Sequence, residues 1–349
     1  ARRRPPNSLK PRSPSLKRRV MRRFAVVKLA SAEMAEKKLA TRAAFGATLA
    51  ELAEEGVPVV AVDADLTGST TTKKFATAAP ENADKLFNCG IAEQNMIDVA
   101  AGLALTGHVA YTGSFAVFGT GRAYDQIRNT VCYSNLDVKI CPTHAGVSVG
   151  PDGGSHQMLE DVSLMRGLPN MRVLVPADYA AARAAIKLAA KTPGPVYVRM
   201  GRAAVPCVYD ADVELELGRA YVLREGSDAT IVACGVEIRE ALAAADALAE
   251  EGISAEVVDA FSVKPLDEDT ITVSVSKTGC CVVAEEHSVH GGLGSAVAEC
   301  LARKNPAPCE FVGVQDRFGK SGEFEELLGY FNLDAAAIVE AVKRAMGRK

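Results

Sequence analysis

Residues 57–63 read Val57-Pro58-Val59-Val60-Ala61-Val62-Asp63, an apolar and mostly β-branched run that ends in a carboxylate. Such a run is typical of a strand that is buried on both faces. Before it, residues 36–55 place apolar side chains at near-helical spacing, and Gly56 follows at the position of a helix C-cap. A helix followed by a fully apolar strand predicts a parallel sheet with helices on both faces.

The same alternation of helix and apolar strand continues to residue 200 and resumes after a break. Residues 201–218 lack periodicity, so we interpret them as a linker between two domains, residues 34–200 and residues 219–349. The predicted fold class is α/β, with two doubly wound parallel-sheet domains of which the second is smaller. Helices are predicted over residues 91–105, 121–133, 178–191, 237–251, 293–303 and 335–346, and strands over residues 137–141, 171–175, 196–200, 229–234, 255–259, 280–284 and 310–314.

The charge of the chain is unevenly distributed. It contains 40 Lys and Arg against 43 Asp and Glu, but residues 1–33 hold 11 of the basic residues and one acid, Glu33. Residues 34–349 therefore carry a net charge of −13, which argues against a nucleic-acid partner. No apolar run approaches the roughly 18 residues of a membrane-spanning helix, so no membrane partner is expected. Nine cysteines without a Cys-x-x-Cys pair predict buried thiols in a reducing compartment, which favours a cytoplasmic protein.

The basic segment 1–33 is rich in arginine, serine and proline. An organellar targeting peptide, a basic arm and translation from an upstream start all fit this composition. Met34 begins a predicted helix with acidic and basic residues and is a plausible natural start. We expect a disordered extension that has no part in the function.

Polar residues follow several of the predicted strands. Asp63 and Asp65 come after the first strand, Glu93 opens a helix, and Thr143-His144 follow the strand that ends at Cys141. Because ligands bind beyond the C-terminal ends of strands in open α/β sheets, these side chains are candidates for a site. The segment 143–157 holds two of the five histidines and an acid, and a loop of this length inside a domain is usually functional.

Four segments carry a resemblance to a known family. They are Cys89-Gly90-Ile91-Ala92-Glu93-Gln94-Asn95-Met96, Ser114-Phe115-Ala116-Val117-Phe118, Arg122-Ala123-Tyr124-Asp125-Gln126 and the loop 143–157. In this order they resemble the transketolases and the deoxyxylulose-phosphate synthases, and the resemblance extends over residues 36–345. It implies a thiamine-diphosphate pyrimidine-binding fold followed by a transketolase C-terminal α/β domain. The implied cofactor is thiamine diphosphate.

The resemblance also implies roles for individual residues near the cofactor. Glu93 matches the carboxyl that protonates the pyrimidine ring, and a positioned acid or base is worth roughly 10²–10⁴-fold in rate. Phe115 and Phe118 match aromatics that hold that ring, and Asp65 matches an acid close to the cofactor. Large transketolases carry a third aromatic three residues further on, where this chain has Gly121. Asp63 has no matching role and is interpreted as a strand-end residue.

A sugar-phosphate substrate calls for arginines and hydroxyl donors. Arg42, Ser69, His144 and Arg202 match the family's phosphate contacts. Asp152 and His156 match groups that bind sugar hydroxyls and move protons, so that His144 and His156 join Glu93 as candidate catalytic residues. The resemblance thus implies transfer of a two-carbon ketol unit between ketose and aldose phosphates, as in the pentose phosphate pathway.

Other activities stay open within the same superfamily. Deoxyxylulose-phosphate synthases usually carry Asp-Arg where this chain has Thr143-His144, and the beta chains of 2-oxoacid dehydrogenases lack this histidine-rich loop. Transketolase is therefore the favoured prediction. A different thiamine enzyme and a non-catalytic partner subunit remain alternatives, and NAD binding at the turn Gly291–Gly294 is a distant one because a lone glycine-rich turn is weak evidence.

One half of the family's machinery is missing from the sequence. The family binds the diphosphate through Mg²⁺ with a Gly-Asp-Gly segment, and no such segment occurs here. We therefore expect no metal ligands on this chain and a partner chain, the N-terminal transketolase subunit, that supplies them. The resemblance implies an α₂β₂ heterotetramer. We predict that His287 and His290 bind no metal, and that Cys280-Cys281 belong to the core.

Overall fold

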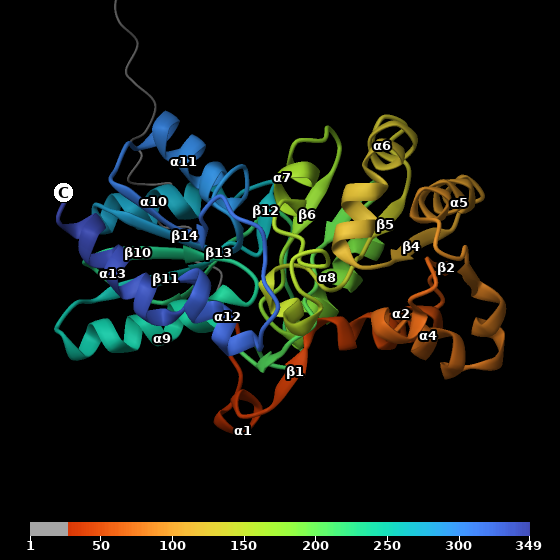
Figure 1. The fold of residues 1–349 in the computed structure, drawn as a ribbon, viewed down its shortest axis with the longest axis horizontal. Coiled ribbons are helices and arrows are strands. Elements are labelled where there is room, and N and C mark those ends of the chain that lie inside the picture. The colour runs from red at the N-terminus through yellow and green to blue at the C-terminus, as the bar shows by residue number, and fades with distance from the viewer. Residues whose placement is uncertain (1–26) are drawn as a thin grey trace, which may run out of the picture.

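Two α/β domains lie next to one another in the computed structural model, which describes residues 27–349 (Figure 1). The sheet of the first domain is ordered β12-β6-β7-β5-β4-β2-β3, and that of the second β14-β13-β10-β11-β9. Within these two sheets, β12 and β9 run antiparallel to their neighbours and the other pairs are parallel. The first sheet consists of β2 (Val59–Asp63), β3 (Leu86–Asn88), β4 (Val109–Gly113), β5 (Val138–Ile140), β6 (Arg172–Leu174), β7 (Val196–Val198) and β12 (Ser262–Lys264). The second consists of β9 (Tyr221–Arg224), β10 (Ala229–Ala233), β11 (Ala255–Asp259), β13 (Cys281–Ser288) and β14 (Cys309–Val314). The predicted fold class is confirmed.

Helices cover both faces of each sheet, and the buried residues form two main clusters, one for each set of helices. One cluster of buried residues contains side chains of α2 (Ala44–Glu54), α8 (Tyr179–Lys191), α9 (Glu237–Glu250) and α13 (Ala335–Met346). The other contains side chains of α5 (Glu93–Leu105), α7 (Asp161–Arg166), α10 (Glu268–Thr278) and α11 (Leu293–Lys304). In Figure 1 these two sets lie below and above the sheets. Each cluster runs through both domains, so the domains share their core rather than meeting at a thin hinge.

The segment between the two domains forms more regular structure than the predicted linker. β12 belongs to the second half of the sequence but pairs with β6 at the edge of the first sheet. Within residues 201–218, β8 (Ala204–Pro206) pairs with β1 (Lys38–Ala40) in a two-stranded antiparallel ribbon. The predicted helix 36–55 is therefore wrong in its first part, because residues 38–40 are committed to that ribbon and α2 begins at Ala44.

The predicted basic extension falls mostly outside the described residues, since it comprises residues 1–33 and the structure begins at residue 27. From there on the chain is held by the segment 201–218 between the domains. Leu29 forms a β-bridge with Tyr209, and Ala30 N–H donates to the carbonyl of Val208 over 2.9 Å. The short helix α1 (Ala32–Ala35) follows, capped by the Ser31 hydroxyl, and it includes Met34.

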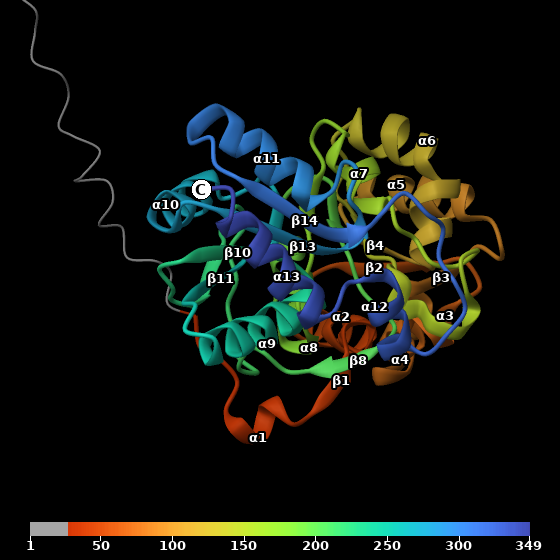
Figure 2. The same cartoon turned by 60° about the vertical axis from the view of Figure 1, so that its left-hand side comes forward.

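The predicted helix 121–133 is replaced by wider turns. Two π-helical segments, Val117–Arg122 and Ile127–Cys132, flank the short α6 (Tyr124–Gln126). Single π turns are frequent at functional sites because they shift side chains out of α-helical register. Here the first of them carries Phe118 and Arg122. Figure 2 shows how this region, which leads from the carboxyl end of β4 to the amino end of β5, faces away from the second domain.

Three smaller helices complete the described chain: α3 (Thr67–Thr70), α4 (Thr72–Ala78) and α12 (Phe324–Phe331). α12 packs on the 3₁₀-helical segment Val147–Asp152 of the first domain. No helix within residues 27–349 has the length and apolar character needed to cross a bilayer.

Candidate functional site

The loops that leave the parallel strands of the first sheet are bonded to one another at its carboxyl edge. After β4, Ala116 N–H donates to the carbonyl of Thr143 over 2.7 Å, and Thr143 N–H donates to the carbonyl of Ser114 over 2.9 Å. After β7, the carbonyl of Met200 accepts from Ala145 N–H over 3.2 Å. The loops following β4, β5 and β7 thus form one continuous hydrogen-bonded surface. It lies at the carboxyl ends of the strands, where the site was predicted.

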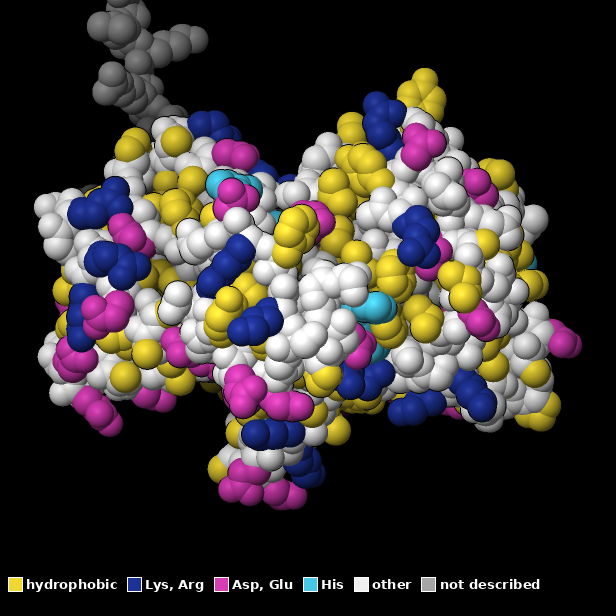
Figure 3. All heavy atoms as spheres, in the orientation of Figure 1, with side chains coloured by type: hydrophobic (Ala, Val, Ile, Leu, Met, Phe, Trp, Pro, Cys, Tyr) yellow, Lys and Arg dark blue, Asp and Glu magenta, His cyan; other side chains and the backbone are white. Residues whose placement is uncertain are grey.

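Four of the predicted site residues form an aromatic cluster on this surface. Phe115 stacks on His144 with ring centroids 3.7 Å apart and an interplanar angle of 23°. Phe115 and Phe118 lie 6.1 Å apart with nearly parallel rings, and His156 meets Phe118 edge-on at 5.4 Å. Phe115 and His144 are buried, whereas Phe118 and His156 are partly exposed. In Figure 3, histidine side chains lie open on the first domain beside hydrophobic ones, with basic side chains below them.

Glu93 lies at the first turn of α5 and is 2% exposed. Its carboxylate forms an ion pair with Arg122, whose Nη1 lies 2.8 Å from Glu93 Oε2. The same guanidinium lies over the ring of Phe118, 4.5 Å from its centroid. The planar guanidinium of Arg122, with its N–H donors, is therefore held between the Glu93 carboxylate and the Phe118 ring. An aminopyrimidine requires the same pair of contacts, so the residues present fit such a ring.

Two predicted phosphate ligands line one pocket. Arg42 and Arg202 border a cavity of about 320 Å³ together with Ser148, Gly150 and Pro151. Arg42 Nη1 donates to the carbonyl of Ser69 over 2.7 Å. Burial and the neighbouring charge of Arg202 lower the pKa of Arg42, as expected for two cations directed at one space. Such a pair suits a phosphate or another anion.

The second domain closes this pocket with Glu323 and Phe324 at the start of α12. The Glu323 side chain takes part in the capping box of that helix, in which Glu326 is the reciprocal partner. Sequence reasoning gave the C-terminal domain no part in the site. The chain offers no local signal for it, since the contact depends on how the two domains pack.

His144 is held as a neutral imidazole. Burial lowers its pKa to about 3, with further contributions from the positive charges of Arg42 and Arg202. The Thr143 hydroxyl lies 2.7 Å from its Nδ1. His144 therefore acts as a hydrogen-bonding group at neutral pH rather than as a cation.

The remaining predicted residues lie at the margin of the site. Asp65 is exposed, and its carboxylate accepts from Asn88 Nδ2 over 3.1 Å. Ser69 contributes its carbonyl to Arg42, whereas no contact tests the role predicted for its hydroxyl. Asp152 is exposed and follows the pocket residue Pro151. Their roles stay predictions.

Asp63 is a structural residue at the strand end. It is buried, and its carboxylate accepts hydrogen bonds from Leu66 N–H and from the hydroxyls of Thr70 and Thr72. Its burial raises its pKa, against which those three hydrogen bonds act. The predicted interpretation of Asp63 as a strand-end residue agrees with these contacts.

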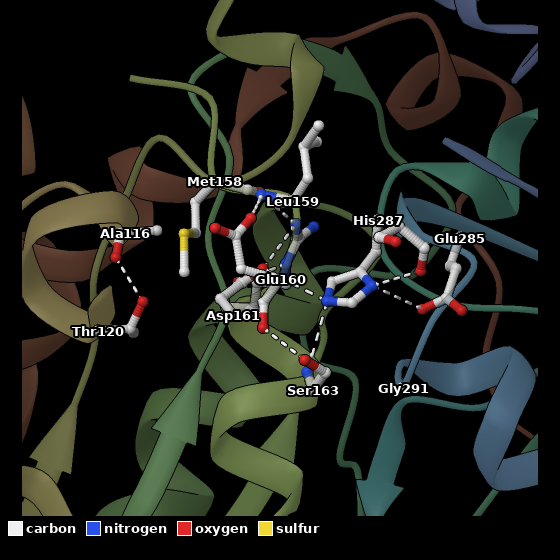
Figure 4. A network of polar contacts seen from close by, with 12 residues as sticks. Ala116, Thr120, Met158, Leu159, Glu160, Asp161, Ser163, Glu285, His287 and Gly291 are labelled. Carbon is white, nitrogen blue, oxygen red and sulfur yellow. Dashed lines mark hydrogen bonds and ion pairs between the residues drawn. The ribbon is translucent and has the colours of Figure 1, made fainter. Parts of the chain in front are cut away.

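A buried polar network missed by the sequence analysis joins the two domains. Asp161 of α7 pairs with Arg199, whose Nε lies 2.7 Å from Asp161 Oδ2. His287 of β13 approaches the same carboxylate at 4.0 Å and accepts from Ser163 N–H over 3.4 Å. Figure 4 shows Asp161 and Ser163 facing His287 and Glu285 across the domain boundary. A signal existed, because charged residues inside apolar strands are rarely buried unless they are paired.

The other motifs of the second domain have structural roles in the described residues. Within 27–349 no group of three or more His, Cys, Asp and Glu side chains is arranged to hold a metal ion. In the turn Gly291–Gly294, a Cβ at Gly292 would lie 2.1 Å from the Glu285 carboxylate, which caps α11 by accepting from Leu293 N–H and Gly294 N–H. Cys280 and Cys281 are buried in the core.

Comparisons with known proteins agree with this architecture. Residues 37–208 match the transketolase pyrimidine-binding domain, and residues 218–338 match the transketolase C-terminal domain. A putative transketolase C-terminal section from Methanocaldococcus jannaschii is 45% identical over 88% of this chain and 96% of its own length. A 6-deoxy-6-sulfo-D-fructose transketolase subunit from a Clostridium species is 43% identical over 86% of this chain and 92% of its own. A solved structure described as a split gene transketolase, inactive beta4 tetramer, superposes with a TM-score of 0.81 at 50% identity, covering 89% of this chain and 99% of that one.

Proposed function

Since the chain belongs to the transketolase family, we propose that it is the C-terminal subunit of a split transketolase. It would transfer a two-carbon ketol unit between ketose and aldose phosphates with thiamine diphosphate as cofactor. One observation carries this proposal. Glu93 and the ring of Phe118 hold the planar guanidinium of Arg122 between them, at the same edge of the sheet as a pocket with two arginines.

The residues that would hold the cofactor's pyrimidine ring are Glu93, Phe115 and Phe118, with Asp65 nearby. When bound, thiamine diphosphate supplies a nucleophilic carbon and an electron sink for the ketol unit. Glu93 would hold a proton at its carboxylate against a ring nitrogen, for which Arg122 must leave Glu93 Oε2. The two phenylalanines provide apolar faces that exclude water from the ring.

The substrate would lie between the aromatic cluster and the arginine pocket. Arg42 and Arg202 would bind its terminal anion, because their charges converge on one cavity. His144 is neutral and its Nδ1 faces Thr143, so its Nε2 is the atom available to a sugar oxygen. His156, at the rim, would bind hydroxyls and move protons together with Asp152.

We further propose that this chain works with a partner that carries the diphosphate and Mg²⁺ site. The absence of a Gly-Asp-Gly segment supports this, as does the near-complete coverage of relatives described as a C-terminal section and a split gene product. An α₂β₂ assembly in the cytoplasm is the form that we propose. The tetramer of beta chains described for the relative is inactive, which fits a chain that needs a different partner.

A second candidate differs in the substrate's terminal anion. The Clostridium relative is named for a sulfonated sugar, and a sulfonate is an oxyanion that a pair of arginines can also bind. Sugar phosphate remains the favoured substrate on the sequence resemblance.

The full chain, alone and mixed with a candidate diphosphate-domain chain, should be assayed with thiamine diphosphate and Mg²⁺. A ketose phosphate, a sulfonated ketose and pyruvate would be offered in turn as donors. We expect ketol transfer from the ketose phosphate in the mixture and none with either chain alone. Turnover of pyruvate instead, or a stable complex that transfers nothing from any donor, would contradict the proposed function.

A further inference from the structure

The second domain contributes a buried carboxylate to the underside of the arginine pocket. Glu286 of β13 is 3% exposed. Its Oε1 accepts a hydrogen bond from the backbone N–H of Ser148, which lies in the loop of the first domain. At Gly146 in the same loop, a Cβ would lie 2.2 Å from the Glu286 carboxyl carbon. The turn after Gly146 is thus shaped around this side chain.

The other side of that turn faces the pocket. Ser148 and Gly150 line the cavity together with Arg202. Between them, the carbonyl of Val149 accepts from Arg202 Nη1 over 2.7 Å. Two consecutive residues of the turn are therefore held in opposite ways: Ser148 by Glu286 from behind, and Val149 by the arginine in front. Any displacement of the turn would move the guanidinium of Arg202.

Arg199 fixes Glu286 in turn. Its Nη2 donates to the Glu286 carbonyl over 3.0 Å and to the Met158 carbonyl over 3.3 Å, and its Nη1 lies 3.8 Å from Glu286 Oε2. Arg199 is also bonded to both oxygens of Asp161. It precedes Arg202 by three residues, so one short segment carries both the cation behind the turn and the cation in the pocket. These buried groups form one hydrogen-bonded network behind the turn.

We propose that Glu286 is a positioning residue for the anion pocket: it holds the turn 146–150 from behind so that Arg202 faces the terminal anion of the sugar. The identity of that anion rests on the proposed function, whereas the support of the turn does not. Glu286 does not touch the substrate. The N–H of Ser148 is occupied by Glu286, so the arginines rather than this amide bind the anion.

Glu286→Ala and Glu286→Gln in the full chain, assembled with its partner, separate this role from a general contribution to folding. KM and kcat would be measured for a ketose phosphate and for the corresponding unphosphorylated ketose. We expect Glu286→Ala to raise KM for the phosphorylated donor about tenfold, the effect of losing one buried hydrogen bond. Kinetics with the unphosphorylated donor should stay unchanged. Glu286→Gln retains an acceptor oxygen and should restore most of the KM.

Glu285→Gln is the matched control, because this neighbouring buried carboxylate caps α11 and makes no hydrogen bond to the turn. It should leave the ratio of the two KM values unchanged. Amide hydrogen exchange of the full chain gives a readout that needs no turnover. Peptides covering residues 146–150 should exchange faster in Glu286→Ala than in wild type, Glu286→Gln or Glu285→Gln.

In Glu286→Ala, an equal rise in KM for both donors would overturn the inference. So would unchanged amide hydrogen exchange of residues 146–150. If the wild-type assembly transfers nothing from ketose phosphates, the proposed function fails on its own. The inference is then decided by hydrogen exchange and by binding of inorganic phosphate, which should weaken about tenfold in Glu286→Ala. Undiminished phosphate binding would count against Glu286 as a support of the pocket.

Discussion

Asp259, at the end of β11, is a carboxyl group whose ionisation the fold opposes. It is fully buried, and the Tyr209 hydroxyl donates to its Oδ2 over 2.5 Å. Its other oxygen, Oδ1, has no hydrogen-bond partner within residues 27–349. Burial raises the pKa of Asp259 from 3.8 to about 7, with a further contribution from the charge of Asp178. Ionisation of this one group should therefore weaken the fold across the neutral range.

The size and sign of the effect follow from the two pKa values. Because the pKa is raised in the folded state, the stabilisation from the neutral carboxyl is complete below pH 3.8 and is lost as the pH rises through about 7. The full span corresponds to about 4 kcal/mol, of which about 3 kcal/mol falls between pH 5 and pH 8. Asp259→Asn keeps the shape and an acceptor for Tyr209 but cannot ionise.

Urea unfolding of the full chain at pH 5 and pH 8 would measure this difference. We expect the free energy of unfolding of Asp259→Asn, relative to wild type, to rise by about 3 kcal/mol between the two pH values. Asp269→Asn removes a carboxylate that is 95% exposed and should show no such change. Parallel pH curves for Asp259→Asn and wild type would refute the reasoning.

Four further variants test other contacts. Arg122→Ala leaves Glu93 buried without its cation and should lower the free energy of unfolding by about 2 kcal/mol; an unchanged urea midpoint would show that the ion pair contributes nothing. Gly146→Ala, at φ +81° and against Glu286, should cost about 3 kcal/mol, whereas Gly102→Ala meets open space within α5 and should stabilise by roughly 0.5–1 kcal/mol. Arg202→Ala should raise KM for a ketose phosphate about 10–100-fold in steady-state kinetics with little change in kcat, and an unaltered KM would remove Arg202 from the anion site.

The parts of the fold that follow from apolar periodicity were predictable. The buried strands β2, β10 and β11 and the helices α8 and α13 agree with the predicted ranges to within two residues. β4 was missed because Thr112 and Gly113 end its apolar run after three residues. α10 was missed because its sequence is rich in threonine and valine, which favour strands. Its helical state depends on the Asp267 N-cap and on Gly279 as C-cap.

The site was predictable where the strand ends and the family motifs coincide. Phe115, Phe118, His144 and His156 form one cluster, and Arg42 and Arg202 share one pocket although 160 residues separate them. The sequence could not predict side-chain contacts that depend on irregular backbone or on the packing of the two domains. Arg122 reaches Glu93 from a π-helical segment, and the second domain supports the pocket from below.

In the proposed function, Glu93 performs acid–base chemistry in an enzyme assembled from this chain and a partner. The most direct measurement is the rate of ketol transfer by the assembled complex with wild-type chain and with Glu93→Gln. Arg122→Ala serves as a control for loss of the ion pair alone. We predict a loss of at least about 100-fold for Glu93→Gln with the complex still formed on a sizing column. Transfer at the wild-type rate by an intact Glu93→Gln complex would contradict the account.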